Sequence, residues 1–230
     1  MEKVSFKKQF FTAKNISYIA VLVALVVVLQ VFGGYIKIAG LSLNLALVPI
    51  VLGAVLFGPF IGGMLGLICG LIVFIYGATG QEPFTFYIFG LSPVITTILC
   101  LVKTTVAGAV AGWIYRLIAK KNKIVAVFTA SALVPILNTG IFAIGCFIML
   151  DDIVGYLLVN FGIDTTGMSA AYIVFVIVIT WNFFIELLTS MLLAPAVSTV
   201  TSVVEKQIVK NMKKNKPVED SSDSGNENNI

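Results

Sequence analysis

The chain has 230 residues, of which 59% are hydrophobic and only 11% are charged, with a mean hydropathy of +1.04 and a net charge of +4. Because soluble domains carry roughly a quarter charged residues, this composition excludes an ordinary soluble domain and predicts an all-α, multi-pass membrane protein. The segment 16–204 has room for about six spans of ~20 residues each. A large catalytic domain outside the membrane is therefore excluded.

Six apolar segments follow one another along the chain and predict six transmembrane helices. Their bounds are 16–32, 41–57, 60–76, 94–117, 124–150 and 170–200. Only Gly58-Pro59 separates the second from the third, which predicts a tight helical hairpin. Segment 77–93 is interrupted by glycine and proline, so we expect it to fold back over the membrane surface without a regular helix.

The basic residues predict the orientation. Thirteen of the fifteen lie in segment 1–15, between the fourth and fifth spans, or in the charged tail 205–230. Because cytoplasmic flanks are enriched in lysine and arginine, both termini are predicted to be cytoplasmic. The positive charge then serves orientation and contact with anionic membrane lipids, and it indicates no nucleic-acid partner. The tail is low in apolar residues and is expected to be disordered.

The residue types present exclude several kinds of chemistry. The chain has no histidine, and Cys69, Cys100 and Cys146 stand alone in apolar runs, so we predict no metal site and no cofactor. The cysteines are expected to be small buried apolar side chains. Neither a Ser/His/Asp set nor a phosphate-binding loop is present. We therefore expect a protein that is not an enzyme.

Small residues recur at four-residue spacing on three of the predicted helices. They are Ala20 and Ala24 on the first, Gly62, Gly66 and Gly70 on the third, and Gly108 and Gly112 on the fourth. Such spacing lets helices approach closely. For the glycines we expect packing inside the bundle, and the alternative is a surface on which another subunit docks.

Two charged residues, Lys103 and Glu186, fall deep inside the predicted spans, away from their ends. Lys103 precedes Arg116 by thirteen residues, which places it roughly 20 Å above the inner flank. Glu186 precedes Lys206 by twenty residues, which places it up to roughly 30 Å above the inner flank, so the two are expected to meet in the outer half. Two interpretations stay open: a structural ion pair, or a binding pocket in which these charges hold a polar ligand.

Amide and aromatic side chains are predicted at the same depth. Asn182 and Glu186 share a helix face at i,i+4 spacing, and Asn138 follows Pro135, which leaves a backbone carbonyl free. Such groups suit a small, flat or polyfunctional solute. The candidate substrate-binding residues are Asn44, Gln81, Glu82, Tyr87, Lys103, Asn138, Trp181, Asn182 and Glu186.

The chain resembles the S components, the substrate-binding membrane subunits of energy-coupling factor (ECF) importers for vitamins and micronutrients in prokaryotes. The resemblance covers about residues 16–200. It rests on the six spans, the AxxxA stripe from Ala20 to Ala24, and the run LNLALVPIVLGAVLFGPFIGGMLGLICGLI with its GPxxG hairpin. It rests also on the segments VPILNTGIFAIGCF and WNFFIELLTSMLLAP.

The resemblance implies a subunit of the prokaryotic plasma membrane that captures a micronutrient at the extracellular side. Energy is implied to come from two ATPase subunits through a transmembrane coupling protein. That protein would contact Ala20 and Ala24, which are therefore expected to be docking residues. The resemblance does not identify the vitamin.

One alternative is a stand-alone secondary transporter or channel that uses Lys103 and Glu186 as an ion or proton relay. The sequence shows no internal repeat of broken helices, which transporters with a site at the membrane midplane use.

Overall fold

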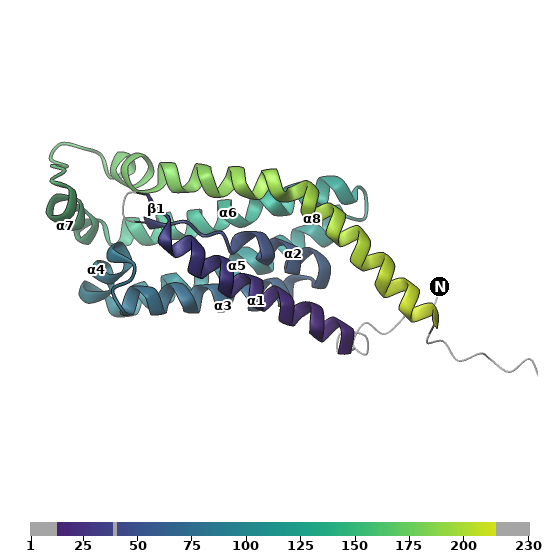
Figure 1. Cartoon of the computed structure of the whole chain (residues 1–230). Coiled ribbons are helices and arrows are strands. Elements are labelled where there is room, and N and C mark those ends of the chain that lie inside the picture. Colours follow the sequence, from purple (N-terminus) through teal and green to yellow (C-terminus); the bar gives the residue numbers. More distant parts are fainter. Residues whose placement is uncertain (1–12, 39–40, 215–230) are drawn as a thin grey trace, which may run out of the picture.

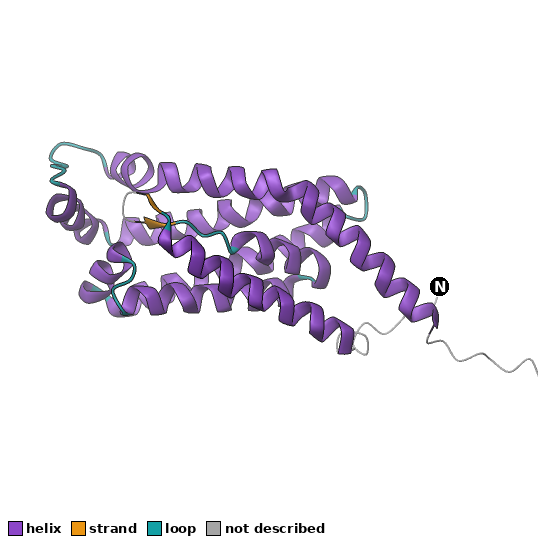
Figure 2. Cartoon of the chain, viewed as in Figure 1, coloured by secondary structure: helices purple, strands orange, loops and turns teal. Residues whose placement is uncertain are grey.

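Helices run along a single elongated bundle in the computed structural model, which describes residues 13–38 and 41–214 (Figures 1 and 2). The long helices are α1 (Ala13–Tyr35), α3 (Pro59–Ala78), α5 (Pro93–Ile118), α6 (Lys123–Ile148) and α8 (Thr180–Lys214). The shorter ones are α2 (Leu47–Phe57), α4 (Pro83–Leu91), α7 (Leu150–Phe161) and the π-helix η2 (Tyr172–Ile179), which continues into α8. A two-residue antiparallel pair joins β1 (Lys37–Ile38) to β2 (Leu41–Ser42). The predicted all-α class is confirmed apart from this pair.

Five helices of the described chain are long and apolar enough to cross a membrane. They are α1, α3, α5, α6 and α8, and they coincide with five of the six predicted spans. In the remaining predicted span, 41–57, strand β2 and an irregular stretch precede α2, which has 11 residues. Such a helix is about 16 Å long, roughly half the hydrocarbon core of a bilayer. The chain is a multi-pass membrane protein, and its six crossings stay a prediction.

The segment 77–93 is more regular than its composition predicted. It contains α4, so the expectation that no regular helix forms there is wrong. Pro83 occupies the first turn of α4, where its missing N–H removes no intrahelical bond. One turn apart, Phe84 and Ile88 bury their side chains. Helix α7, which was not predicted, ends at Gly162 in the left-handed conformation.

The ends of the chain fall partly outside the described residues. Residues 1–12 and 215–230 are not described, so most of the predicted N-terminal segment and much of the predicted tail are not tested. Helix α8 continues to Lys214, past the predicted end of the transmembrane domain at residue 204.

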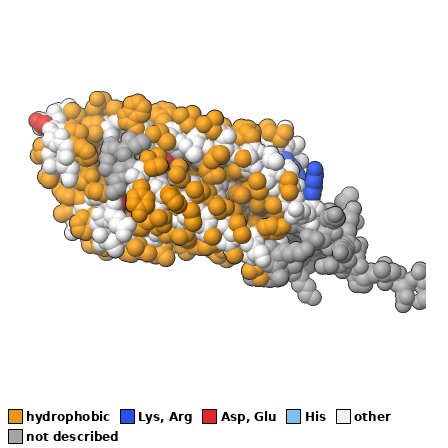
Figure 3. Space-filling view, in the orientation of Figure 1, with side chains coloured by type: hydrophobic (Ala, Val, Ile, Leu, Met, Phe, Trp, Pro, Cys, Tyr) orange, Lys and Arg blue, Asp and Glu red, His pale blue; other side chains and the backbone are white. Residues whose placement is uncertain are grey.

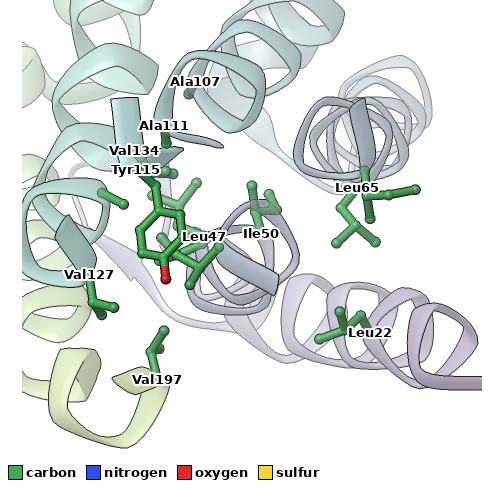
Figure 4. Close-up of a cluster of buried hydrophobic side chains, with 14 of the residues drawn as sticks. Leu22, Leu47, Ile50, Leu65, Ala107, Ala111, Tyr115, Val127, Val134 and Val197 are labelled. Atoms are coloured by element: carbon green, nitrogen blue, oxygen red, sulfur yellow. The ribbon is translucent and has the colours of Figure 1, made fainter. Parts of the chain in front are cut away.

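The main apolar core surrounds the short helix α2. Leu47 and Ile50 of α2 are buried among side chains from α1, α3, α5, α6 and α8 (Figure 4). A second apolar cluster packs α4, α7 and η2 against α6, with Tyr156 and Phe84 in edge contact. The first cluster packs the helices around α2, and the second packs the helices around α7.

The predicted glycine stripes form the contact between α3 and α5, which confirms their assignment to internal packing. A Cβ atom on Gly62 would lie 2.5 Å from the carbonyl oxygen of Gly108, and one on Gly112 would lie 2.8 Å from the nitrogen of Pro59. The hydroxyl of Thr104 on α5 donates a 2.7 Å hydrogen bond to the carbonyl of Gly66. Only glycine allows the two backbones to approach this closely.

Replacing Gly66 with alanine is therefore expected to destabilise the bundle. The new methyl group would overlap the carbonyl of Thr104 and lie 2.9 Å from the Cα atom of Thr105, which costs about 1–3 kcal/mol when backbone must move. The thermal midpoint in detergent measures the effect. Gly140→Ala is the matched control, because a Cβ atom there meets nothing within 4 Å. An equal midpoint for the two variants would contradict the prediction.

Candidate functional site

A polar cavity of about 40 Å³ lies inside the bundle. Among the residues lining it are six of the nine predicted substrate-binding residues: Asn44, Glu82, Lys103, Asn138, Asn182 and Glu186. They come from the segment before α2, from the start of α4, and from α5, α6 and α8. The structure thus brings together polar side chains that are up to 142 positions apart in sequence.

The other three predicted residues do not line this cavity. Trp181 is 67% exposed although it is adjacent to Asn182. Gln81 is exposed just before α4. Tyr87 is half-buried and packs against the ring of Tyr156, with 5.3 Å between ring centroids.

Glu186 is the centre of the hydrogen-bond network in the cavity. Its Oε1 atom accepts a 3.1 Å hydrogen bond from the backbone N–H of Asn44 and a 3.3 Å hydrogen bond from the side chain of Asn182. Asn44 stands where the chain turns into α2, and the N-terminal end of a helix favours a negative charge. The second carboxylate oxygen, Oε2, is buried and has no partner among the described residues.

Glu82 is buried and joins two outer segments. Its Oε1 atom accepts a 3.1 Å hydrogen bond from the backbone N–H of Ser42 in β2, and its Oε2 atom accepts a 2.6 Å hydrogen bond from the hydroxyl of Thr85 in α4. Both carboxylate oxygens are therefore engaged. Glu82 is a positioning residue that fastens the β1–β2 hairpin to α4 beside the cavity.

Replacing Glu82 with alanine is expected to loosen this hairpin. Loss of the carboxylate leaves the N–H of Ser42 without its partner, at a cost of about 1–3 kcal/mol. Amide hydrogen exchange at Ser42 is expected to accelerate by about tenfold, because each 1.4 kcal/mol corresponds to a factor of ten. Asp151→Ala, which removes an exposed carboxylate on α7, is the control. Unchanged exchange at Ser42 would show that other contacts hold the hairpin.

Lys103 approaches the cavity from α5 without pairing with Glu186. Its Nζ atom lies 4.8 Å from the centroid of the Phe142 ring, a cation–π distance. With the described residues it forms neither an ion pair nor a hydrogen bond. The structural ion pair considered from the sequence is therefore not formed, and the ammonium group keeps its donors available.

Residues that sequence reasoning missed complete the wall. Polar ones are Gln30, Ser42, Thr85 and Thr139, and apolar ones are Val73, Phe142, Ile179 and Phe183. Gln30 is 3% exposed and accepts a 3.4 Å hydrogen bond from the thiol of Cys69. An amide inside an apolar span, near its C-terminal end, was a signal that depth reasoning applied to α1 would have found.

The three cysteines are buried and free, and the described residues contain no cluster of metal-binding side chains. The residues that line the cavity offer one ammonium, two carboxylates, amides, hydroxyls and aromatic rings.

A comparison with models of protein families identifies the family of this chain. The model for the substrate-specific component of ECF transporters matches residues 14–198. The chain belongs to this family. No curated protein and no solved structure matches the chain. An ECF substrate-specific component is a transport subunit, not an enzyme, and works in a membrane with the other components of an ECF module.

The family match covers the whole cavity. The match extends from the start of α1 into α8 and so includes every element that lines the cavity. The predicted family resemblance is confirmed.

Proposed function

We propose that this subunit captures a vitamin or related micronutrient at the extracellular side of a prokaryotic plasma membrane and delivers it to an ATP-driven ECF importer. The polar cavity inside the bundle carries the proposal. Buried polar groups are costly in a bundle surrounded by lipid, and here several of them converge on one cavity.

The charge distribution supports the proposed orientation, with both termini in the cytoplasm. Acidic side chains appear at one end of the bundle and basic ones toward the other (Figure 3). Helix α7, with Asp151 and Asp152 in its first turn, lies at the end opposite to the start of α1 (Figure 1). Arg116 lies in the last turn of α5, and Lys120 lies in the turn between α5 and α6. This arrangement is what the enrichment of cytoplasmic flanks in basic residues predicts.

The region around α2 supports a sixth crossing. Strand β2, the irregular stretch 43–46 and α2 follow one another, and the irregular part borders the cavity through Asn44. Irregular backbone at membrane depth is tolerated where it is buried in protein or lines a polar cavity. We therefore count this composite segment as the second of six crossings.

An uncovered face of α1 supports docking on a coupling protein. Ala20 and Ala24 are exposed, while Leu22 and Val26 on the opposite side of α1 are buried in the core. Small residues on an apolar helix face permit close approach of a second helix in a membrane. We propose that the coupling protein, which is linked to two ATPase subunits, packs on this face.

Transport by reconstituted vesicles tests the proposal. Proteoliposomes that contain the chain alone or together with a complete ECF module are incubated in the small-molecule fraction of yeast extract, and their contents are compared by mass spectrometry. Accumulation is expected only with the module and with ATP at the ATPase side. A non-hydrolysable ATP analogue is the control. Robust accumulation by the chain alone would support the stand-alone transporter instead.

A further inference from the structure

Three buried hydrogen-bond acceptors beside the cavity have no partner among the described residues. They are Asn138 Oδ1, Asn182 Oδ1 and Glu186 Oε2. Asn138 is 5% and Glu186 4% exposed. Leaving buried acceptors unpaired is costly, and native interiors contain few of them. Three that line the same cavity indicate a partner that the protein chain itself does not supply.

The identity of the open atoms follows from the hydrogen bonds that Glu186 already accepts. Its Oε1 atom accepts from the backbone N–H of Asn44, and an amide beside such an acceptor turns its NH₂ group toward it. Asn182 does this at 3.3 Å, and turning its amide around would place two oxygen atoms against each other. Asn138 lines the same cavity, and its Oδ1 atom is buried without a partner among the described residues. The atoms left for a ligand are therefore acceptors, and they require donors.

Lys103 on α5 offers hydrogen-bond donors, in contrast to these acceptors. Lys103 carries three N–H donors and no acceptor, and it contacts the ring of Phe142. Glu82, the other carboxylate of the cavity, is engaged with Ser42 and Thr85. Lys103 is thus the positive group of the cavity that remains for an acceptor on the ligand.

We propose that the cavity binds a small molecule with two chemically opposite ends. One end is rich in N–H donors, as in an amine, an amidine or an amino-substituted heteroaromatic ring, and lies against Asn138, Asn182 and Glu186. The other end carries a carboxylate or a comparable acceptor, and lies against Lys103. This inference rests on the proposed capture function and specifies its substrate class. Dicarboxylates and other solutes without N–H donors are excluded by it.

The size of the cavity agrees with a compact donor group. Its volume of about 40 Å³ is room for about three water molecules, since one water needs at least ~10–15 Å³ on this measure. An amidine, with its three non-hydrogen atoms, matches that space.

Affinity selection tests the inference. The purified full-length protein in detergent is incubated with the small-molecule fraction of yeast extract, washed, and analysed by mass spectrometry beside Glu186→Gln. The enriched compound is expected to carry both an N–H donor group and an acidic or acceptor group. Its retention by Glu186→Gln is expected to fall about tenfold or more, because hydrogen bonds to a charged partner are the strong ones.

Ser131→Ala is the matched control. It removes a buried acceptor without a partner on α6, but Ser131 does not line the cavity, so retention is expected to stay unchanged. Asn182→Leu serves as the second variant if Glu186→Gln does not fold, as judged by its thermal midpoint.

The outcomes separate this inference from the proposed function. An enriched compound without N–H donors, or one retained equally by Glu186→Gln and Asn182→Leu, would overturn the inference and leave capture of a micronutrient standing. Enrichment of no compound by the wild-type protein would overturn both.

Discussion

Phenylalanine at both Ala20 and Ala24 is expected to abolish uptake by the assembled transporter and to leave solute binding by the isolated subunit unchanged. Both alanines are exposed on α1, one turn apart, and point away from the buried residues Leu22 and Val26. Two bulky rings would hold a docking helix away from the backbone of α1. Overpacking of this kind costs about 1–3 kcal/mol per site, enough to lower assembly by at least about tenfold.

Uptake by vesicles that contain the whole module, and ligand binding by the purified subunit, are measured for the same variant. Ala20→Ser with Ala24→Ser is the matched control, because serine keeps the close approach and is expected to preserve both activities. If the double phenylalanine variant lost solute binding as well, the stripe would be part of the internal packing of the subunit and not a docking surface.

The long helices could be predicted because the bilayer imposes a length that is visible in the sequence. Runs of about 20 apolar residues are needed to span it, and α3, α5 and α6 begin and end within about three residues of the predicted bounds. Helices α4 and α7 lie outside the long spans, so no such length requirement marks them. Helix α2 is also short, because the chain before it is engaged in β2 and in the cavity wall.

For the candidate site, the sequence predicted how deep in the membrane each residue lies, but not which face of its helix the residue is on. Counting residues placed Lys103 and Glu186 in the outer half of the membrane, and the structure brings both to one cavity together with Asn138. The same counting included Trp181, which is largely exposed. Neighbouring residues on a helix point about 100° apart, so adjacency to Asn182 carries no information about sharing its face.

Ser42 and Thr85 were missed for a different reason. Both are small polar residues in outer segments, where polar residues are ordinary, and only the fold shows that they hold Glu82 in place. Their role depends on a contact between the β1–β2 hairpin and α4 that no local pattern encodes.

Lys103→Met and Glu186→Gln are each expected to lower the affinity for the captured solute by about tenfold or more, because each variant removes a charged hydrogen-bond partner. Assembly with the coupling protein is expected to persist, since both residues line the interior cavity while the docking face of α1 is on the outside. Dissociation constants of the purified variants and co-purification with the coupling protein measure the two effects. Unchanged affinity in both variants would exclude these residues from the binding site.

The double variant distinguishes a binding site from a structural ion pair. If Lys103 and Glu186 hold opposite ends of one ligand, their losses in binding free energy are independent and add to within about 0.5 kcal/mol, so affinity falls by the product of the two single effects. If the residues instead neutralised each other, removing both would restore part of what either single change costs, because the uncompensated buried charge would be gone. The separation of the Lys103 ammonium, which contacts Phe142, from the carboxylate of Glu186, which accepts from Asn44 and Asn182, favours the additive result.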